Sequence, residues 1–377
     1  MQKKITVILL SIYFLFPHTA FCKNDFHCSA KAAALIDASS GKILYEKNAD
    51  EKLAPASTTK IITALCALKY GDKNSIVTVS KKASQNEGSS MYLKPGEKLS
   101  LSNLLTGLML VSGNDAATAA AEHISKSEEA FVMLMNQTAH EIGAKNTCFQ
   151  NPHGLPRENH YTTAHDLAKI SAYAIKNPDF AKIVSTKTAQ ITTENGEKKY
   201  LANHNKLLKL YDGCKGIKTG FTKSAGRCLV TCAERNGLSL ICVTLNDGND
   251  WADHTRLYDT AFEKFESKKF IKKGEPIGYA KVAGGSEKKV KLVAKHDVFV
   301  AEEKGTKSNL SLFKEEKIYL PAPLKKDDTE LFFDIIENDK KIGEVIACPE
   351  KDIKTAVSAK KAKETTENSF LKRLFKQ

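Results

Sequence analysis

Three short groups of residues combine a side-chain hydroxyl with a lysine or an amide: Ser57-Thr-Thr-Lys60, Ser112-Gly-Asn114 and Lys218-Thr-Gly220. A serine hydroxyl becomes a useful nucleophile when a neighbouring base accepts its proton. Lysine can be that base only in its neutral form, which burial and a nearby cation both favour by lowering its pKa. The three groups together therefore predict serine acyl transfer with lysine as the general base.

The pattern S-x-x-K is weak evidence alone, because it occurs six times in this chain. Ser57 is distinguished by its context: it follows Ala54-Pro-Ala56 and precedes the apolar run Ile61–Leu68, which is typical of a helix start with a buried body. In that first turn, Lys60 would lie on the same side of the helix as Ser57. The remaining occurrences fall in a predicted hairpin turn or in lysine-rich stretches near the end of the chain; they begin at Ser39, Ser286, Ser311, Ser358 and Ser369. We therefore predict Ser57 as the nucleophile and Lys60 as the base.

The second motif predicts groups that position the base and move protons. Ser112 can relay a proton to a leaving amine, and Asn114 can hold Lys60 in place while it binds a substrate amide. Lys218 would approach Lys60 and help to depress its pKa.

The third motif predicts the substrate-binding strand. Thr219 offers a hydroxyl to a substrate carboxylate, and Gly220 would permit close approach of a substrate backbone. The backbone N–H groups of Ser57 and Phe221 could form an oxyanion hole, worth about 3 kcal/mol per donor. This chemistry requires no cofactor and no metal.

The elements around these motifs predict an α+β fold. Two opening strands (32–36 and 42–46) precede the Ser57 helix, and a hairpin (227–233 and 238–245) precedes a closing helix (251–265). Between them lies a helical region, with predicted helices at 101–111, 115–124, 128–142 and 163–175. The catalytic domain is predicted to span residues 23–266.

Short alternating runs separated by Gly, Pro and Lys predict a small, mostly β domain at 267–350. Residues 351–377 are polar, carry eight Lys/Arg and three Asp/Glu, and end with four apolar side chains on one helical face. Those four are Phe370, Leu371, Leu374 and Phe375. This pattern predicts a tether and a short amphipathic helix that binds an anionic membrane surface.

The first 22 residues are predicted to be an export signal, with Lys3-Lys4 before the apolar stretch 5–16 and cleavage before Lys23. Lipidation of Cys22 is the alternative.

The chain has nine cysteines, and their spacing is not that of a metal site. We interpret them mainly as small buried apolar residues, and one or two disulfide bonds are the alternative.

The chain has a net charge of +13 but no arginine-rich stretch. A polyanionic cell wall or an anionic membrane is therefore a better predicted partner than nucleic acid.

The motifs, in this order, resemble those of the low-molecular-weight penicillin-binding proteins, the D-alanyl-D-alanine carboxypeptidases of the serine peptidase S11 family. The matching segments are 54–60, 109–116, 151–155 and 216–222. The resemblance implies a β-lactamase/transpeptidase-like catalytic domain that removes the terminal D-alanine from peptidoglycan stem peptides through a penicillin-sensitive acyl-enzyme. It also implies that Lys218 and Thr219 bind the substrate carboxylate, that β-lactams are covalent inhibitors, and that His153 is structural. The export signal and the tail predict a location at the outer face of the cytoplasmic membrane.

One feature departs from the family pattern. Many members carry an arginine about thirty residues after K-T-G, near the substrate carboxylate, but residues 246–251 contain none. Arg256 follows on the predicted closing helix, where a surface charge is the expected role. Three alternatives stay open: a DD-endopeptidase, a β-lactamase using Glu158 (which lacks the E-x-x-L-N context), and a non-enzymatic wall- or penicillin-binding protein.

Overall fold

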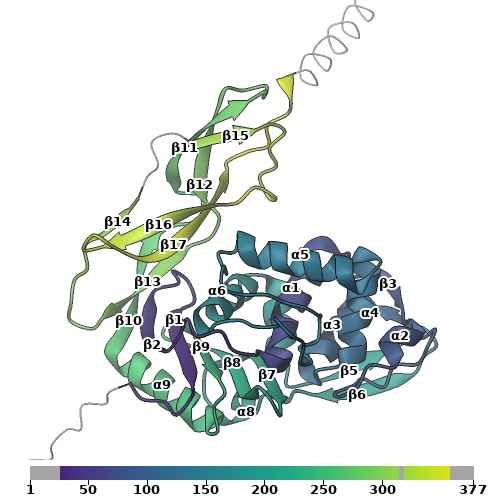
Figure 1. Cartoon of the computed structure of the whole chain (residues 1–377). Helices are drawn as coiled ribbons and strands as arrows, with labels where there is room; N and C mark the ends of the chain where they lie inside the picture. Colours follow the sequence, from purple (N-terminus) through teal and green to yellow (C-terminus); the bar gives the residue numbers. More distant parts are fainter. Residues whose placement is uncertain (1–25, 314–317, 357–377) are drawn as a thin grey trace, which may run out of the picture.

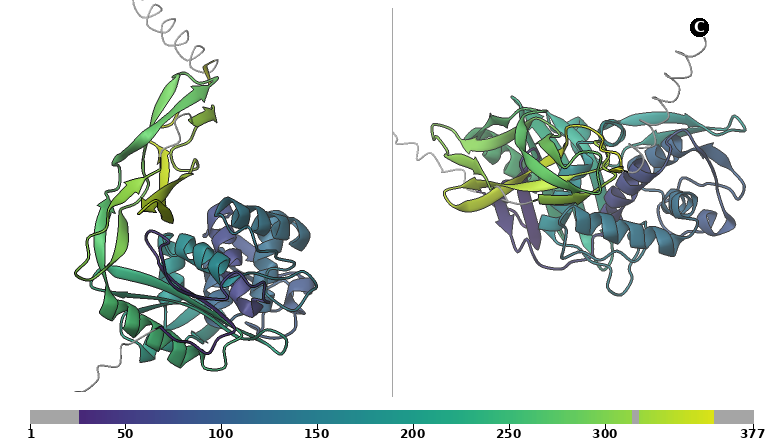
Figure 2. Two further views of the ribbon diagram at one scale, coloured as in Figure 1. Left: turned by 60° about the vertical axis from the view of Figure 1, so that its left-hand side comes forward. Right: turned by 90° about the horizontal axis from the view of Figure 1, so that it is seen from above.

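The computed structural model describes residues 26–313 and 318–356 (Figure 1). The predicted export signal, Cys22 and the amphipathic segment with Phe370, Leu371, Leu374 and Phe375 lie outside the described residues. The described chain forms an α+β part that carries all three motifs and a β-rich arm that projects from it (Figures 1 and 2). The predicted fold class is thereby confirmed.

A five-stranded antiparallel sheet forms the base of the catalytic part, in the order β2-β1-β9-β8-β7. Its strands are β1 (Ala32–Asp37), β2 (Ile43–Lys47), β7 (Cys214–Thr222), β8 (Gly226–Arg235) and β9 (Leu238–Leu245). Segments from both ends of this part share one sheet, because β1 pairs with β9. β7, which carries the K-T-G motif, lies at an edge and is therefore open to pairing with a substrate backbone.

The sheet is covered on both faces, which explains why all six residues of β1 are buried. Alternate side chains of a strand point to opposite faces. Ala34 and Ile36 join the core beneath the helical region, whereas Ala33 and Leu35 join a second core beneath α9 (Asp250–Lys264).

The helical region surrounds α1, which contacts α3 to α7. The helices are α1 (Lys60–Tyr70), α2 (Lys81–Ser84), α3 (Leu101–Leu110), α4 (Asn114–Ser125), α5 (Glu128–Glu141), α6 (Ala164–Ala174), α7 (Pro178–Ser185) and α8 (Leu207–Leu210). Side-chain caps fix several starts: Ser127 accepts a hydrogen bond from Ala130 N, and Thr163 from Asp166 N. Pro178 opens α7 at a first-turn position that tolerates proline.

Two small hairpins in the helical region have no counterpart among the predicted elements. One pairs β3 (Ile76–Thr78) with β4 (Lys98–Ser100), and the other pairs β5 (Thr188–Thr192) with β6 (Lys198–Ala202). Within the two strands of the second hairpin, Ile191 and Leu201 are the only buried residues, so these strands carry almost no apolar alternation.

The arm is built from strands, as the sequence predicted. Its strands are β10 (Phe265–Ile271), β11 (Pro276–Ala283), β12 (Lys289–Ala294), β13 (Val298–Glu303), β14 (Leu310–Leu312), β15 (Ile318–Pro321), β16 (Leu331–Glu337) and β17 (Lys340–Pro349). β10 pairs with β13, and the others form a six-stranded sheet in the order β14-β16-β17-β12-β11-β15. Ile353 is buried in the arm core and pairs with Leu324, so the described chain belongs to the arm beyond residue 350.

The turn between β1 and β2 joins the arm to the catalytic part. Asp37 is buried there and accepts a hydrogen bond from Ala301 N of β13 at 3.0 Å. Ser39 Oγ accepts one from Phe299 N at 2.8 Å, and Lys42 forms an ion pair with Glu337 at 2.9 Å. The S-x-x-K pattern that begins at Ser39 is therefore part of a structural joint.

Candidate active site

Ser57 lies in a 3₁₀ turn, η1 (Ala56–Thr59), which leads directly into α1. The sequence placed Ser57 in the first turn of the α-helix itself; the structure places it one step earlier, with Lys60 as the first residue of α1. Ala56, just before Ser57, has a φ of 47°, a left-handed conformation that costs energy for a residue with a Cβ. Surrounding contacts must hold this turn in place.

Lys60 is completely buried, and its amine contacts three oxygen atoms. Nζ lies 3.2 Å from Ser57 Oγ, 2.7 Å from Asn114 Oδ1 and 2.6 Å from the backbone oxygen of His153. Burial lowers the pKa of Lys60 well below its ordinary value, and the charge of Lys218 lowers it further. The carboxylate of Asp115 opposes this shift by a smaller amount.

These three contacts direct the lone pair of a neutral Lys60. The oxygens of Asn114 and His153 can only accept hydrogen bonds, so each takes one N–H of the amine. A neutral amine has two N–H groups and one lone pair, and the lone pair is then left for the hydroxyl of Ser57. The arrangement therefore suits removal of the Ser57 proton.

The loop at 151–155 supports the turn that carries Ser57. Gly154 has a φ of 89°, and a Cβ at this position would overlap the backbone oxygen of Ala56. Thr63 of α1 donates to the backbone oxygen of Pro152 at 2.6 Å. The sequence reasoning assigned the loop a structural role, but it missed that a backbone oxygen of this loop holds the catalytic amine.

The imidazole ring of His153 makes its own local contacts, and its Nε2 lies 3.9 Å from Glu128 Oε1. Its Nδ1 accepts a hydrogen bond from Leu155 N at 3.2 Å. Burial lowers the pKa of His153 to about 3, so the ring is neutral at physiological pH.

Ser112 and Asn114 flank the start of α4. Ser112 has a φ of 63°, and among the described residues its buried Oγ has no hydrogen-bond partner. A strained residue with an unused hydroxyl beside a nucleophile suits proton transfer to a leaving group. The loop opposite is fixed by Asp115, whose carboxylate accepts from Met91 N at 3.0 Å and Leu93 N at 3.1 Å.

The K-T-G residues alternate along edge strand β7. Lys218 is buried and donates to the backbone oxygen of Thr219 at 3.0 Å, and burial lowers its pKa to about 7. Phe221 is exposed at the strand edge.

Gly220 lies against the turn that carries Ser57. A Cβ on Gly220 would lie 3.0 Å from Ser57 N and 3.1 Å from Pro55 O. The glycine thus lets β7 pack closely against this turn, and its close approach to a substrate backbone stays a prediction.

An open cavity of about 290 Å³ lies in front of Ser57. Ser57, Ser112, Thr219, Gly220 and Phe221 line it, while Lys60, Asn114 and Lys218 are buried. The structure adds lining residues that the sequence reasoning missed: Ser89, His204, Arg227, Asp250 and Trp251. These come from loops and from the strand and helix that follow K-T-G, so no local motif marks them.

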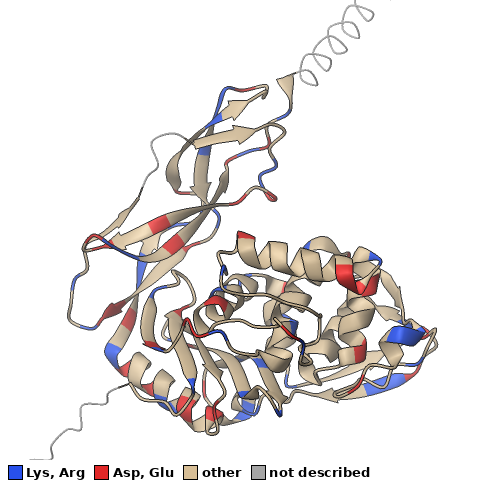
Figure 3. Cartoon of the chain, viewed as in Figure 1, with Lys and Arg blue, Asp and Glu red and all other residues tan. Residues whose placement is uncertain are grey.

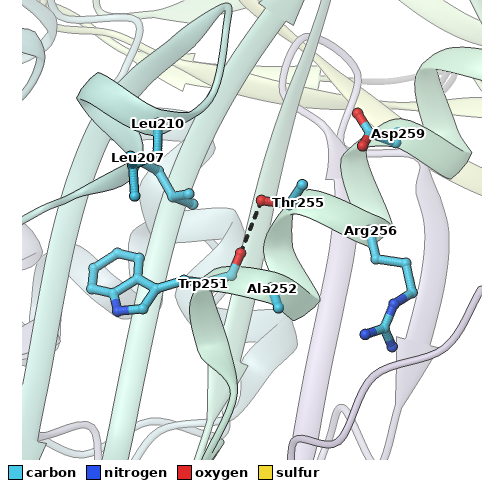
Figure 4. A pocket seen from close by; sticks show the side chains of 7 residues that line it. All are labelled: Leu207, Leu210, Trp251, Ala252, Thr255, Arg256 and Asp259. Carbon is cyan, nitrogen blue, oxygen red and sulfur yellow. Dashed lines mark hydrogen bonds between the residues drawn. The ribbon is translucent and has the colours of Figure 1, made fainter.

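Arg256 belongs to a separate open hollow of about 460 Å³ on the α9 side (Figure 4). Its guanidinium points away from Trp251 in that view, and its Nη1 lies 3.4 Å from Asp253 Oδ1. Trp251 lines both cavities and stands between them. Arg256 therefore does not line the cavity in front of Ser57.

No group of His, Cys, Asp and Glu within the described ranges could hold a metal ion. The eight described cysteines are free thiols, and those expected in apolar runs are buried: Cys66, Cys228, Cys232 and Cys242. In the part of the chain that the structure describes, no helix is long and apolar enough to span a membrane.

Residues 19–249 match the family model described as D-alanyl-D-alanine carboxypeptidase, peptidase S11. The chain belongs to this family. Residues 265–365 match the model of the penicillin-binding protein 5 C-terminal domain. The chain is 35% identical to the D-alanyl-D-alanine carboxypeptidase DacF of Bacillus subtilis over 99% of this chain and 98% of the relative.

Solved structures agree with these matches. The crystal structure of penicillin-binding protein 5 from Haemophilus influenzae superposes with a TM-score of 0.65 at 31% identity, covering 88% of this chain and 99% of that chain. A mutant of the Streptomyces K15 DD-transpeptidase superposes with a TM-score of 0.61 at 32% identity, covering 63% of this chain and 100% of that one.

Proposed function

We propose that this protein is a serine DD-carboxypeptidase that removes the terminal D-alanine from peptidoglycan stem pentapeptides. The observation that carries the proposal is the buried Lys60 amine, which lies 3.2 Å from Ser57 Oγ and donates to the amide oxygen of Asn114 and the backbone oxygen of His153. In the neutral amine, these two acceptors leave the lone pair for the Ser57 hydroxyl. The open edge of β7 beside it offers a peptide-binding strand. The family of the chain and the names of its relatives support the same reaction.

In the acylation step, Ser57 Oγ attacks the carbonyl carbon of the penultimate D-alanine and its proton passes to Lys60 Nζ. Backbone N–H groups of Ser57 and Phe221 stabilise the oxygen that gains negative charge. The C–N bond then breaks, and the departing amine takes the proton held on Lys60, which passes through Ser112. After D-alanine leaves, water attacks the acyl carbon while Lys60 accepts a proton from it. Lys60 then returns this proton to Ser57 Oγ as the ester bond breaks and the shortened peptide leaves. β-Lactams would acylate the same serine.

The structure gives no support to the β-lactamase alternative. Glu158 is exposed and does not line the cavity in front of Ser57, so it is not placed to activate a deacylating water. A DD-endopeptidase would use the same residues on a cross-linked peptide, and it differs only in the leaving group.

The direct test is release of D-alanine from diacetyl-Lys-D-Ala-D-Ala, with and without penicillin. We expect steady release that penicillin abolishes. Parallel digestion of cross-linked muropeptides separates a carboxypeptidase from an endopeptidase. Binding of penicillin without turnover of either substrate would contradict the proposal and favour a penicillin-binding protein without enzymatic activity.

We further propose that the mature enzyme is exported and held at the outer face of the cytoplasmic membrane by the segment that follows Ala356. The described chain ends at the tip of the arm, remote from the helices that surround the active site (Figure 1). Lys/Arg and Asp/Glu are interspersed over both parts in the view of Figure 3. Membrane attraction is therefore assigned to the tail, whose charge and apolar face suit anionic lipid.

A mature form that ends at Ala356 is expected to stay in solution with anionic vesicles, while the full mature chain sediments with them, less so at high salt because salt screens the lysines. The cut is placed after Ala356 because Ile353 is buried in the arm core. Both forms should release D-alanine from small peptides at the same rate. If both stay in the supernatant at low salt, the tail does not anchor the enzyme.

A further inference from the structure

Arg227 lies on β8, beside the K-T-G strand, and lines the active-site cavity. It is the second residue of β8 and pairs directly with Phe221 of β7. Directly opposed residues, and residues two apart on one strand, point to the same face of a sheet. Arg227, Phe221 and Thr219 therefore share one face, and all three line the cavity. Resting on the proposed carboxypeptidase function, we propose that Arg227 binds the terminal carboxylate of the substrate together with Thr219.

The guanidinium of Arg227 is held in place but keeps free donors. Its Nη2 donates to Asp250 Oδ1 at 2.6 Å, and its centre lies 5.6 Å from the ring centroid of Trp251. A guanidinium has five N–H donors. The buried Nε of Arg227 has no hydrogen-bond partner among the described residues. Asp250 thus orients the guanidinium group of Arg227 and leaves some of its N–H groups for the carboxylate of a substrate.

Asp250 does not cancel the attraction of Arg227 for a substrate. Its carboxylate oxygen also accepts a hydrogen bond from Trp251 N at 2.8 Å, at the first turn of the fifteen-residue helix α9. The partial positive charge of a helix N-terminus offsets part of the carboxylate charge. The local surroundings of Arg227 therefore stay favourable to an anion.

Arg227 brings a permanent positive charge to the cavity in front of Ser57. Among the described residues that line the cavity, it is the only Lys or Arg. Lys218 is buried behind the strand edge, and its pKa of about 7 leaves it only partly charged at neutral pH. An arginine stays protonated throughout this range. Arg256, the other candidate, lies in the separate hollow of Figure 4.

The test compares two substrates that differ only in this charge: diacetyl-Lys-D-Ala-D-Ala and its C-terminal amide. In the wild type we expect the free acid to be the better substrate by kcat/KM. Arg227→Ala should lower kcat/KM for the acid by about 20- to 100-fold, the loss expected for a hydrogen bond between charged groups. It should change kcat/KM for the amide by less than about threefold, so the preference for the acid collapses.

Matched variants separate carboxylate binding from support of the fold. Arg256→Ala should change kcat/KM for neither substrate by more than about threefold. Arg227→Lys should keep part of the preference for the acid, because lysine supplies a positive charge but not the planar guanidinium group. Arg227→Gln, which keeps most of the side-chain length, serves if the alanine variant melts early by circular dichroism. Equal losses on acid and amide, or no loss on the acid, would overturn the proposal. A wild type that releases no D-alanine would instead refute the carboxypeptidase function itself.

Discussion

Ser57→Ala is expected to abolish covalent labelling by fluorescent penicillin and to lower kcat for D-alanine release by at least about 10⁴-fold. The side chain loses the only atom that forms the acyl bond, so neither a penicillin nor a peptide can be held covalently. Ser57 lines the cavity and lies in a turn fixed mainly by backbone packing, so removal of its Oγ should leave the fold intact. Gel fluorescence measures the loss of covalent labelling, and an unchanged circular-dichroism melting curve checks that the fold is intact.

Ser39→Ala is the matched control, because Ser39 begins the only S-x-x-K pattern upstream of Ser57 in the sequence. Its Oγ accepts a hydrogen bond from Phe299 N in the joint between the two parts. The variant should label as fully as the wild type, with at most a small loss of stability. Persistent labelling of Ser57→Ala, or label mapped to Ser39, would show that the nucleophile is wrongly assigned.

The elements that carry the motifs could be predicted because their patterns are strong. β9 is an eight-residue apolar run after the turn at Asn236-Gly237, and it forms as expected at Leu238–Leu245. The family resemblance rests on short motifs at the starts of α1 and α4, in the loop 151–155 and on β7, and the fold brings these segments together.

The contacts that make the site work could not be predicted in the same way, because they involve backbone atoms or residues distant in sequence. The backbone oxygen of His153 holds Lys60 across 93 positions of the chain, and any residue type carries such an oxygen. Gly220 is required by the approach of the Ser57 turn, which depends on tertiary packing. Arg227 enters the cavity through the register of β7 with β8, and a shift by one residue would point it to the other face.

Lys60→Arg is expected to abolish acylation, with a loss of at least about 10³-fold, while the protein still folds. Arginine cannot lose its proton near neutral pH, so it offers no lone pair to Ser57. In the wild type, burial and the charge of Lys218 lower the pKa of Lys60 well below the value of about 10.4 found in peptides. The base acts only when deprotonated, so the acylation rate should rise with pH through that lowered pKa and be nearly complete well below pH 10.

Lys218→Met gives the readout that separates a true base from a merely structural lysine. Removing the neighbouring cation removes one of the two causes that depress the pKa of Lys60, so the rising limb of the pH–rate profile should move to higher pH. The move should be partial, because burial is the larger cause and stays in place. Because two interacting lysines titrate as a pair, the apparent pKa read from the rising limb belongs to the pair rather than to one residue. An active Lys60→Arg enzyme, or a limb that does not move in Lys218→Met, would mean that another group takes the proton of Ser57.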